Sequence, residues 1–346
     1  MKKRYDILLF LATIVITIFG IVMIYSASSI WSAYKFGDAF KYVKNQALFG
    51  IIGVIVMLLL RKVDYKIYYK KTNFILIACF ILLILVLIPG IGSIRNGSRS
   101  WFGIGGFGIQ PSEAAKIGLI MFTAKYLEKS NKFIKNLKKG VFPILIILFL
   151  IFGLIMLQPD FGTGMIIVIS IIAMLFIAGV NMKFFIAGGV IGIIGIVALI
   201  LIAPYRMDRI TSFLNPWSDP LGTGFQIIQS LYAIGPGGLL GVGFLNSRQK
   251  QFYLPEPQTD FIFSIISEEL GILGVLLVSF LFIIILWCGF KIALNSKNLF
   301  AKYLAFGLTF QMLVQAILNL MVVIGMIPVT GVTFRGTHLL HTLFSP

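Results

Sequence analysis

Three carboxylates stand at the head of one of the most apolar runs in the chain. Asp260, Glu268 and Glu269 lie within YLPEPQTDFIFSIISEELG, residues 253–271. A carboxylate in hydrocarbon is costly unless it is paired or hydrated. These acids are therefore expected to face water, to meet a partner, or to do chemistry such as accepting a proton as a general base.

The elements that must position these acids are predicted to be membrane helices. Of the 346 residues, 59% are hydrophobic and only 12% are charged, with a mean hydropathy of +1.00. A soluble domain carries about 25% charged residues. We expect an all-α polytopic membrane protein forming a single domain over residues 1–346, because apolar runs long enough to cross a bilayer recur along the chain. The nine expected spans are 7–27, 46–60, 73–90, 112–127, 141–157, 162–180, 183–203, 260–290 and 302–325.

The formal net charge of +17 follows from topology. If the N-terminus is cytoplasmic, most Lys and Arg residues fall in cytoplasmic segments, as the positive-inside rule requires. This distribution favours a protein embedded in membrane lipids and argues against nucleic acid as a partner. The first apolar run exceeds the roughly 7–15 residues of a signal peptide, so it is expected to remain as a helix.

Residues suited to ligand binding gather in three segments that are predicted to be external, 89–116, 157–164 and 204–259. The third is too long for a plain connector. It separates the seventh and eighth spans and is expected to form an Ω-like or re-entrant element on the membrane face. Within it, residues 225–234 have a short amphipathic pattern, with Gln226, Gln229 and Ser230 on or near one side. The substrate-binding candidates are Arg95, Arg99, Glu113, Lys116, Arg206, Arg209, Gln226, Gln229, Ser230, Arg248 and Glu268.

The Arg residues in this set, with Lys250, suit phosphate groups, since Arg binds oxyanions through a planar fork. Neighbouring aromatic residues suit sugars or acyl chains. A ligand with phosphates and a lipid tail would fit both. No metal site is expected, because His338 and His341 are too few to hold one.

Several acids allow more than one interpretation. Glu113 and Lys116 share a helix face at i, i+3, either as a mutually neutralised pair or as substrate-binding groups. Asp160 is expected to be a helix N-cap, with a contribution to the external site as the alternative. Glu268 lies about 80° round a helix from Asp260 and about 12 Å deeper, so it could line the same cavity. Glu269 is expected to pair inside the bundle, through Lys116.

Long ordered motifs then resemble one family. NGSRSWFGIGGFGIQPSEAAKI, QPDFGTG, YRMDRITSFLNPWSDPLGTGFQIIQSLYAIGPGGLLGVG and LPEPQTDFIFSIISEELG are similar to the SEDS family (shape, elongation, division and sporulation), closest to its FtsW and SpoVE branch. The resemblance runs from the first span to about Gly331. It implies a ten-helix membrane glycosyltransferase that polymerises lipid II into glycan strands. The implied partners are a class B penicillin-binding protein and other division or sporulation proteins.

The resemblance also implies a catalytic role for Asp260, in the motif Thr259-Asp260-Phe261. A carboxylate with a raised pKa suits a general base that deprotonates the acceptor hydroxyl, and the family's stereochemistry implies one inverting displacement. Cations would stabilise the leaving pyrophosphate. No cofactor is firmly implied, although a divalent ion, Mg²⁺ or Mn²⁺, could assist.

The end of the chain departs from the family pattern. After Pro328-Val-Thr-Gly the family continues with an SYGG-type loop and a tenth helix, whereas this chain reads RGTHLLHTLFSP. The tenth helix is therefore expected to be truncated, leaving an atypical stub at 332–346. Two other functions stay open: a lipid II flippase, which needs polar groups through the whole membrane depth, and an inactive scaffold for a penicillin-binding protein.

Overall fold

The computed structural model describes residues 2–95, 98–104, 107–202, 207, 211, 213–222 and 224–328. Each predicted span coincides with a helix. The long helices are α1 (Lys2–Phe36), α2 (Lys41–Leu60), α3 (Tyr65–Leu85), α4 (Pro111–Ser130), α5 (Phe142–Met156), α6 (Phe161–Ile177), α7 (Met182–Ile202), α10 (Ile262–Asn295) and α11 (Leu299–Val323). The predicted stub at 332–346 lies outside the described residues.

Six helical segments of the described chain are long and apolar enough to cross a membrane, and α6 and the first part of α7 are apolar but shorter. The helix α4 is not among them because polar residues, including Glu113 and Lys116, interrupt its apolar sequence. A helix that carries charges within a membrane bundle is expected to turn them away from lipid. In this fold α4 lies between other helices.

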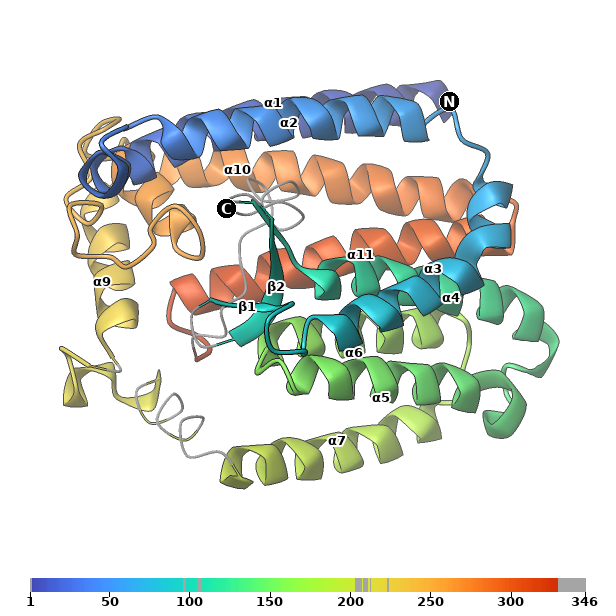
Figure 1. Ribbon diagram of the computed structural model, residues 1–346. Helices are drawn as coiled ribbons and strands as arrows, with labels where there is room; N and C mark the ends of the chain where they lie inside the picture. The colour runs from blue at the N-terminus through green and yellow to red at the C-terminus, as the bar shows by residue number, and fades with distance from the viewer. Residues whose placement is uncertain are drawn as a thin grey trace.

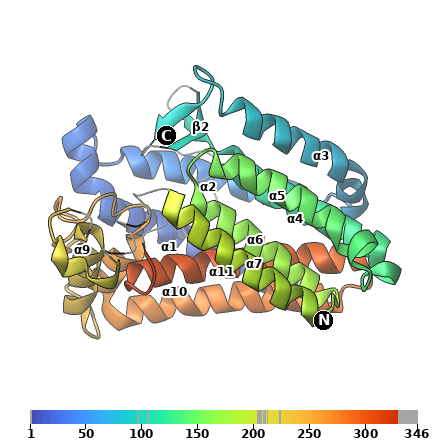
Figure 2. The same ribbon diagram turned by 90° about the horizontal axis from the view of Figure 1, so that it is seen from below.

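The helices run side by side (Figures 1 and 2). One group consists of α1, α2, α10 and α11, in which α1 packs on α2 and α10. A second consists of α3, α4, α5 and α6, and α11 joins the two groups by packing on α4 and α6. Each group has its own buried apolar core. The many large apolar side chains on the outside of the bundle are those that a bilayer would cover.

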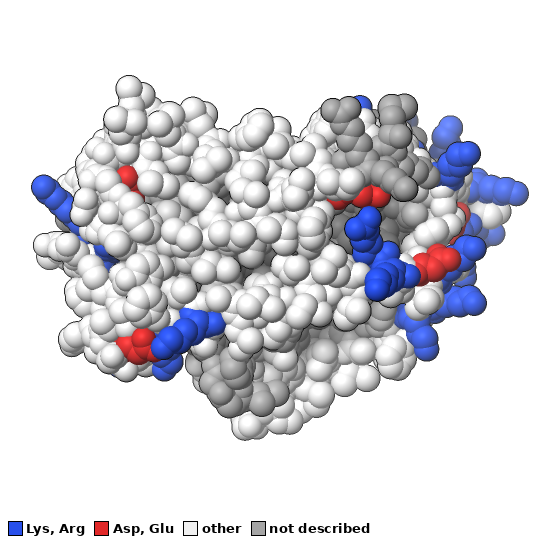
Figure 3. Space-filling view, turned by 90° about the horizontal axis from the view of Figure 1, so that it is seen from above, with Lys and Arg blue, Asp and Glu red and all other residues white. Residues whose placement is uncertain are grey.

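The two ends of the bundle differ in charge. Lys and Arg gather at the end where α1 begins, on the right in Figure 3, and the middle of this face is almost uncharged. We call this end the basic end. The opposite end, here the loop end, carries residues 37–40, 89–110, 157–160 and the described part of 213–261 (Figure 1). The loop end is therefore the end predicted to be external.

The first segment at the loop end adds a small sheet to the predicted helical bundle. Residues 93–109 contribute a three-stranded antiparallel sheet of β1 (Ser93–Arg95), β2 (Ser98–Ile104) and β3 (Phe107–Ile109), in the order β1-β2-β3. Asn96-Gly97 and Gly105-Gly106 separate the strands in sequence. Both are pairs that two-residue hairpin connections favour, a signal that outweighs the surrounding apolar composition.

In the long segment 204–259, the amphipathic pattern at 225–234 predicts a helix, and the structure has α9 (Phe225–Ile234) there. Short 3₁₀ turns flank it at Pro216–Ser218 and Gly235–Gly237. The helix packs on α10 and α11 at the loop end, at the left of Figure 1. Its amphipathic pattern explains this position, because the apolar face with Ile227 and Ile228 is buried.

Near the loop end, α10 is broken at Gly271, which has φ +60° and ψ −154°. The loop segment 237–243 fills the break. Two loop amides donate to helix carbonyls before the break, and two helix amides after it donate to loop carbonyls. These bonds are Val242 to Glu268, Gly243 to Glu269, Ile272 to Gly238 and Leu273 to Leu239, at 2.9, 3.1, 3.0 and 3.3 Å. The backbone groups that the break would leave unpaired are thus satisfied by the loop.

The substitution Gly271→Ala is expected to lower thermal stability clearly. A Cβ atom at this position would lie 2.5 Å from the backbone nitrogen of Gly241. The backbone conformation of Gly271 is one that essentially only Gly adopts, and it adds about 1–3 kcal/mol for a residue with a side chain. Thermal unfolding of the purified protein measures the change. Gly153→Ala in α5 is the matched control, since nothing lies within 4 Å of its Cβ position. Equal stability of the two variants would contradict the prediction.

Candidate active site

Asp260 lies directly before α10, at the loop end, and is half-buried. Its backbone carbonyl accepts a hydrogen bond of 2.9 Å from the side-chain amide of Asn319 on α11. Asn319 is itself fully buried. The start of α10 is thereby fixed against α11, and the carboxylate is held at the boundary between the bundle and the loops.

The surroundings of Asp260 favour its neutral form. Burial raises the pKa of Asp260 to about 7, and the negative charges of Glu256 and Asp160 act in the same direction. An acid with such a pKa is ionised in part at neutral pH and regains a proton readily. Those are the properties of a general base that must accept a proton and then release it.

The start of α4 brings a buried charge pair to the same end of the bundle. Lys116 Nζ lies 2.6 Å from Glu113 Oε1, with side-chain exposures of 1% and 4%, and donates to Gln315 Oε1 on α11 at 3.2 Å. The predicted sharing of one helix face is confirmed. The pairing neutralises Glu113, so Lys116 is the centre of a network that joins α4 to α11.

Asp160 links this pair to Asp260. Its carboxylate accepts from the backbone N–H of Thr163 at 3.0 Å, which confirms the predicted N-cap of α6, and from Gln110 Nε2 at 3.0 Å. Burial raises the pKa of Asp160, while these hydrogen bonds and the Lys116 charge oppose the rise. The N-cap residue therefore also belongs to the external site, so the two interpretations of Asp160 are compatible.

The sheet reaches the same region through Ser98, whose hydroxyl donates to the carbonyl of Gln158. Both amide atoms of Gln158 are buried without a hydrogen-bond partner in the described part of the chain. On the adjacent residue of β2, Arg99 is half-buried. Arg95 has its backbone in β1, and its side chain lies outside the described residues, as do Arg206 and Arg209. The structure thus places one of these four predicted cations, Arg99, at the loop end.

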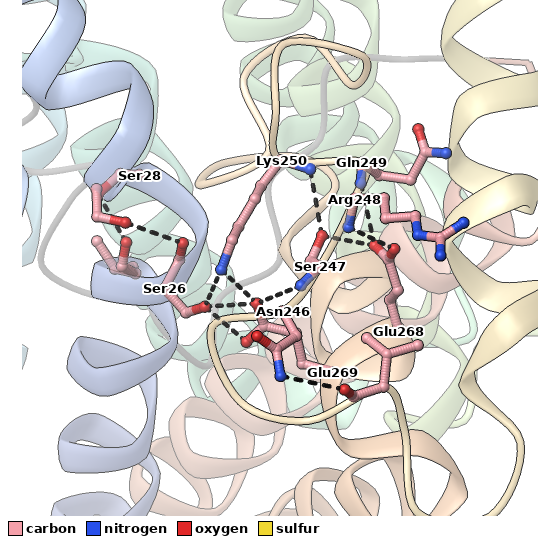
Figure 4. Close-up of polar contacts among 12 residues, drawn as sticks. Ser26, Ser28, Asn246, Ser247, Arg248, Gln249, Lys250, Glu268 and Glu269 are labelled. Atoms are coloured by element: carbon pink, nitrogen blue, oxygen red, sulfur yellow. Dashed lines mark hydrogen bonds and ion pairs between the residues drawn. The ribbon is translucent and has the colours of Figure 1, made fainter.

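A second buried network holds the loop that precedes Asp260 (Figure 4). Lys250 Nζ lies 2.7 Å from Glu269 Oε1 and 3.0 Å from the hydroxyl of Ser26 on α1. Ser26 also donates to Glu269 at 2.6 Å. The prediction that Glu269 pairs with Lys116 is therefore wrong, because Lys116 is occupied by Glu113 and Lys250 reaches Glu269 from the loop. The expected internal pairing of Glu269 is confirmed, with a different partner.

Glu268 completes this network from the other side. Its two carboxylate oxygens accept from the Ser247 hydroxyl at 2.6 Å, from the Arg248 N–H at 2.8 Å and from the Gln249 N–H at 3.4 Å. Glu268 is 1% exposed. The structure does not support the prediction that Glu268 lines the same cavity as Asp260. The backbone of the loop encloses the Glu268 carboxylate, so Glu268 supports the loop instead.

The remaining candidates divide by exposure. Arg248 is exposed and points away from the network in Figure 4. Gln226 and Gln229 on α9 are half-buried. Ser230 is fully buried, donates to the Val323 carbonyl at 2.6 Å and lies 2.8 Å from the Ser264 hydroxyl. Ser230 therefore fastens α9 to α10 and α11.

Several residues of the site escaped the sequence analysis, namely Gln110, Gln315, Asn319, Ser26 and Ser247. All five are buried polar residues. The signal that could have identified them is an amide or hydroxyl within an apolar helix, or beside one, since such groups seek partners inside the bundle. Sequence spacing alone does not show which distant helix supplies the partner.

Comparison with known proteins agrees with this architecture. The family model for FtsW, RodA and SpoVE, described as cell cycle protein, matches residues 6–335. The chain belongs to the FtsW, RodA and SpoVE family. Stage V sporulation protein E of Bacillus subtilis (strain 168) is 52% identical over 332 residues, 96% of this chain and 91% of the relative. The predicted family is therefore confirmed, and this similarity agrees with the predicted FtsW and SpoVE branch.

Other members of the family extend the comparison. The probable peptidoglycan glycosyltransferase FtsW of Geobacter metallireducens is 38% identical over 348 residues, 99% of this chain and 93% of the relative. A solved chain from a study of a peptidoglycan synthase complex that coordinates polymerization and crosslinking superposes with a TM-score of 0.78 at 26% identity, covering 97% of this chain and 93% of that chain. The fold of this FtsW, RodA and SpoVE family member is thus that of a multi-pass membrane protein.

Proposed function

We propose that the protein is a peptidoglycan glycosyltransferase that polymerises lipid II at the outer face of the bacterial cell membrane, with its N-terminus in the cytoplasm. The observation that carries the proposal is the half-buried Asp260 at the loop end, where Lys116, Asp160 and Asn319 converge. Relatives that share nearly the full length of the chain bear the name peptidoglycan glycosyltransferase. The gathering of basic residues at the other end supports the orientation.

In the proposed reaction, the Asp260 carboxylate accepts the proton of the acceptor sugar hydroxyl as its oxygen attacks the anomeric carbon of the donor. The new glycosidic bond forms as the bond to the polyprenyl pyrophosphate breaks, in one inverting displacement. Positive charge near the leaving group stabilises it. We assign this task to Arg99, with Arg95, Arg206, Arg209 and Arg248 as further candidates.

A divalent ion, Mg²⁺ or Mn²⁺, is a further proposal. Within the described residues, no group of three or more His, Cys, Asp and Glu side chains lies together to hold a metal. Such an ion would therefore need the pyrophosphate of the substrate as a ligand. The proposed macromolecular partner is a class B penicillin-binding protein, with division or sporulation proteins, in line with the solved peptidoglycan synthase complex.

The distribution of buried charge favours an enzyme over a lipid II flippase. The charged side chains that are buried in the described part of the chain are Glu113, Lys116, Lys250, Glu268 and Glu269. All of them belong to the two networks at the loop end. A flippase needs polar groups along the whole path across the membrane, whereas a transferase needs them at the face where the bond forms.

The test is incubation of the purified protein with labelled lipid II, with and without a class B penicillin-binding protein. Glycan strands on a gel are the expected result. In a parallel experiment, lipid II enclosed in the inner leaflet of vesicles reports transfer across the membrane. Transfer without polymer would establish the flippase, and the absence of both polymer and transfer with the partner present would leave this chain as a scaffold.

The rate of polymerisation is expected to rise with pH as Asp260 ionises. Its pKa is raised to about 7, and a general base works in its deprotonated form, so the rate should climb through neutral pH and level off above about pH 8. Initial rates at constant ionic strength between about pH 5.5 and 8.5 measure the profile. Unfolding temperatures over the same range provide the control, and a flat profile would contradict the assignment.

A further inference from the structure

Three aromatic side chains meet at the loop end, outside the networks described above. Trp31 and Tyr34 stand at the end of α1, and Phe252 comes from the loop before Asp260. The ring of Phe252 lies 5.6 Å from that of Trp31 and 5.3 Å from that of Tyr34, both edge to face, and the first two rings are 6.3 Å apart. These contacts join residues more than two hundred positions apart in the sequence.

The rings are held open rather than buried. Tyr34 is 78% exposed and Phe252 is 51% exposed. The backbone of Phe252 is left-handed, with φ +66°, a conformation that costs a bulky residue about 1–3 kcal/mol and is often found at ligand sites. Lys250, two residues earlier, is anchored to Glu269 and Ser26. The anchored loop thus exposes the Phe252 ring at the surface, although its backbone conformation is unfavourable for Phe.

Polar side chains near the aromatic cluster interact electrostatically with one another and with Asp260. Tyr42, at the start of α2, interacts electrostatically with Glu256 of the same loop as Phe252. Glu256 also interacts electrostatically with Asp260. Glu256, with φ +45°, is a second strained residue of the same loop. The loop that carries Phe252 therefore also carries the Glu256 carboxylate and continues directly to Asp260.

We propose that Trp31, Tyr34 and Phe252 form a platform that binds a sugar ring of the glycan strand beside Asp260. The inference rests on the proposed function and adds a binding site for the carbohydrate to it. Aromatic faces bind the C–H face of a sugar, and a neighbouring hydroxyl and carboxylate bind its hydroxyl and amide groups. An acyl chain would need the rings but not Tyr42 and Glu256, so the mixed chemistry favours a sugar.

Platform variants are expected to make shorter strands from lipid II. Phe252→Ala and Tyr34→Ala should release the growing strand sooner and so give a shorter mean strand length than the wild type. One lost ring is expected to weaken strand binding about three- to tenfold. Phe252→Tyr keeps the ring and should restore strand length. Phe133→Ala, an exposed ring at the basic end, is the control.

Direct binding separates this proposal from the proposed function. Purified uncrosslinked glycan oligomers are titrated against wild type, Phe252→Ala and Phe133→Ala in detergent, with unfolding temperatures confirming that each variant is folded. If Phe252→Ala binds the oligomers more weakly than both the wild type and Phe133→Ala, the platform is supported. This result does not depend on polymerisation, whereas the failure of every preparation to polymerise lipid II would reject the proposed function. Wild-type affinity together with full-length strands from Phe252→Ala would overturn the platform and leave the rings as anchors at the membrane interface.

Discussion

Asp260→Asn is expected to lower the rate of glycan polymerisation by at least about 10²-fold, the usual contribution of a positioned general base. Asn matches Asp in size and keeps its hydrogen-bonding shape but cannot accept the proton. The carbonyl that binds Asn319 is unchanged by the substitution, so the start of α10 should keep its place. The measurement is the initial rate of strand formation from labelled lipid II.

Two variants make this result specific. Asp219→Asn, an exposed acid in the same external segment, should keep the wild-type rate. Asp260→Glu retains a carboxylate displaced by one methylene and should keep part of the activity. If Asp260→Asn polymerised lipid II at the wild-type rate, Asp260 could not be the base, and the search would move to Asp160.

Lys250→Met is expected to lower stability by about 3–5 kcal/mol, as removal of one partner of a buried ion pair typically does. Lys250 and Glu269 have side-chain exposures of only 2% and 0%. The variant would leave the carboxylates of Glu268 and Glu269 buried with no cation in the network. A large drop in unfolding temperature should result, with loss of activity where the loop loosens around Asp260.

A double variant and an exposed pair serve as controls for this prediction. Lys250→Met with Glu269→Gln removes both charges of the ion pair and should recover much of the lost stability. The Glu269 carboxylate is then gone, and the Glu268 carboxylate keeps its hydrogen bonds from Ser247, Arg248 and Gln249. Lys44→Met breaks the exposed pair with Asp38, in which the two side chains are 68% and 39% exposed, and should leave the unfolding temperature nearly unchanged. Equal losses from Lys250→Met and Lys44→Met would show that the buried network contributes little.

The sequence predicts those features that depend on neighbours in the chain. Hydropathy marks the spans, and the short amphipathic pattern gives α9. The i, i+3 spacing gives the Glu113–Lys116 pair, and Asp160 before an apolar run gives the N-cap. In each case the physical cause acts within one or two helical turns, so local residues contain the information.

Features that depend on distant contacts could not be predicted in the same way. Glu269 pairs with Lys250 of the loop and not with Lys116 of α4, the lysine that the sequence suggested as its partner. The break at Gly271 depends on loop amides that replace lost helical bonds. A single glycine in an apolar run gives no sign of this, because glycine is common in membrane helices.

The contact of Ser26 with Glu269 spans 243 positions of sequence, which has a consequence for biosynthesis. Ser26 leaves the ribosome early, as part of α1, whereas Glu269 and the break at Gly271 follow only after the helices from α2 to α9 have been made. The contact surface of α1 for α10 therefore stays open during most of translation. Lipid or the insertion machinery must cover this surface until then. A ribosome stalled before α10 would leave a nascent chain whose first helix has not yet packed on α10.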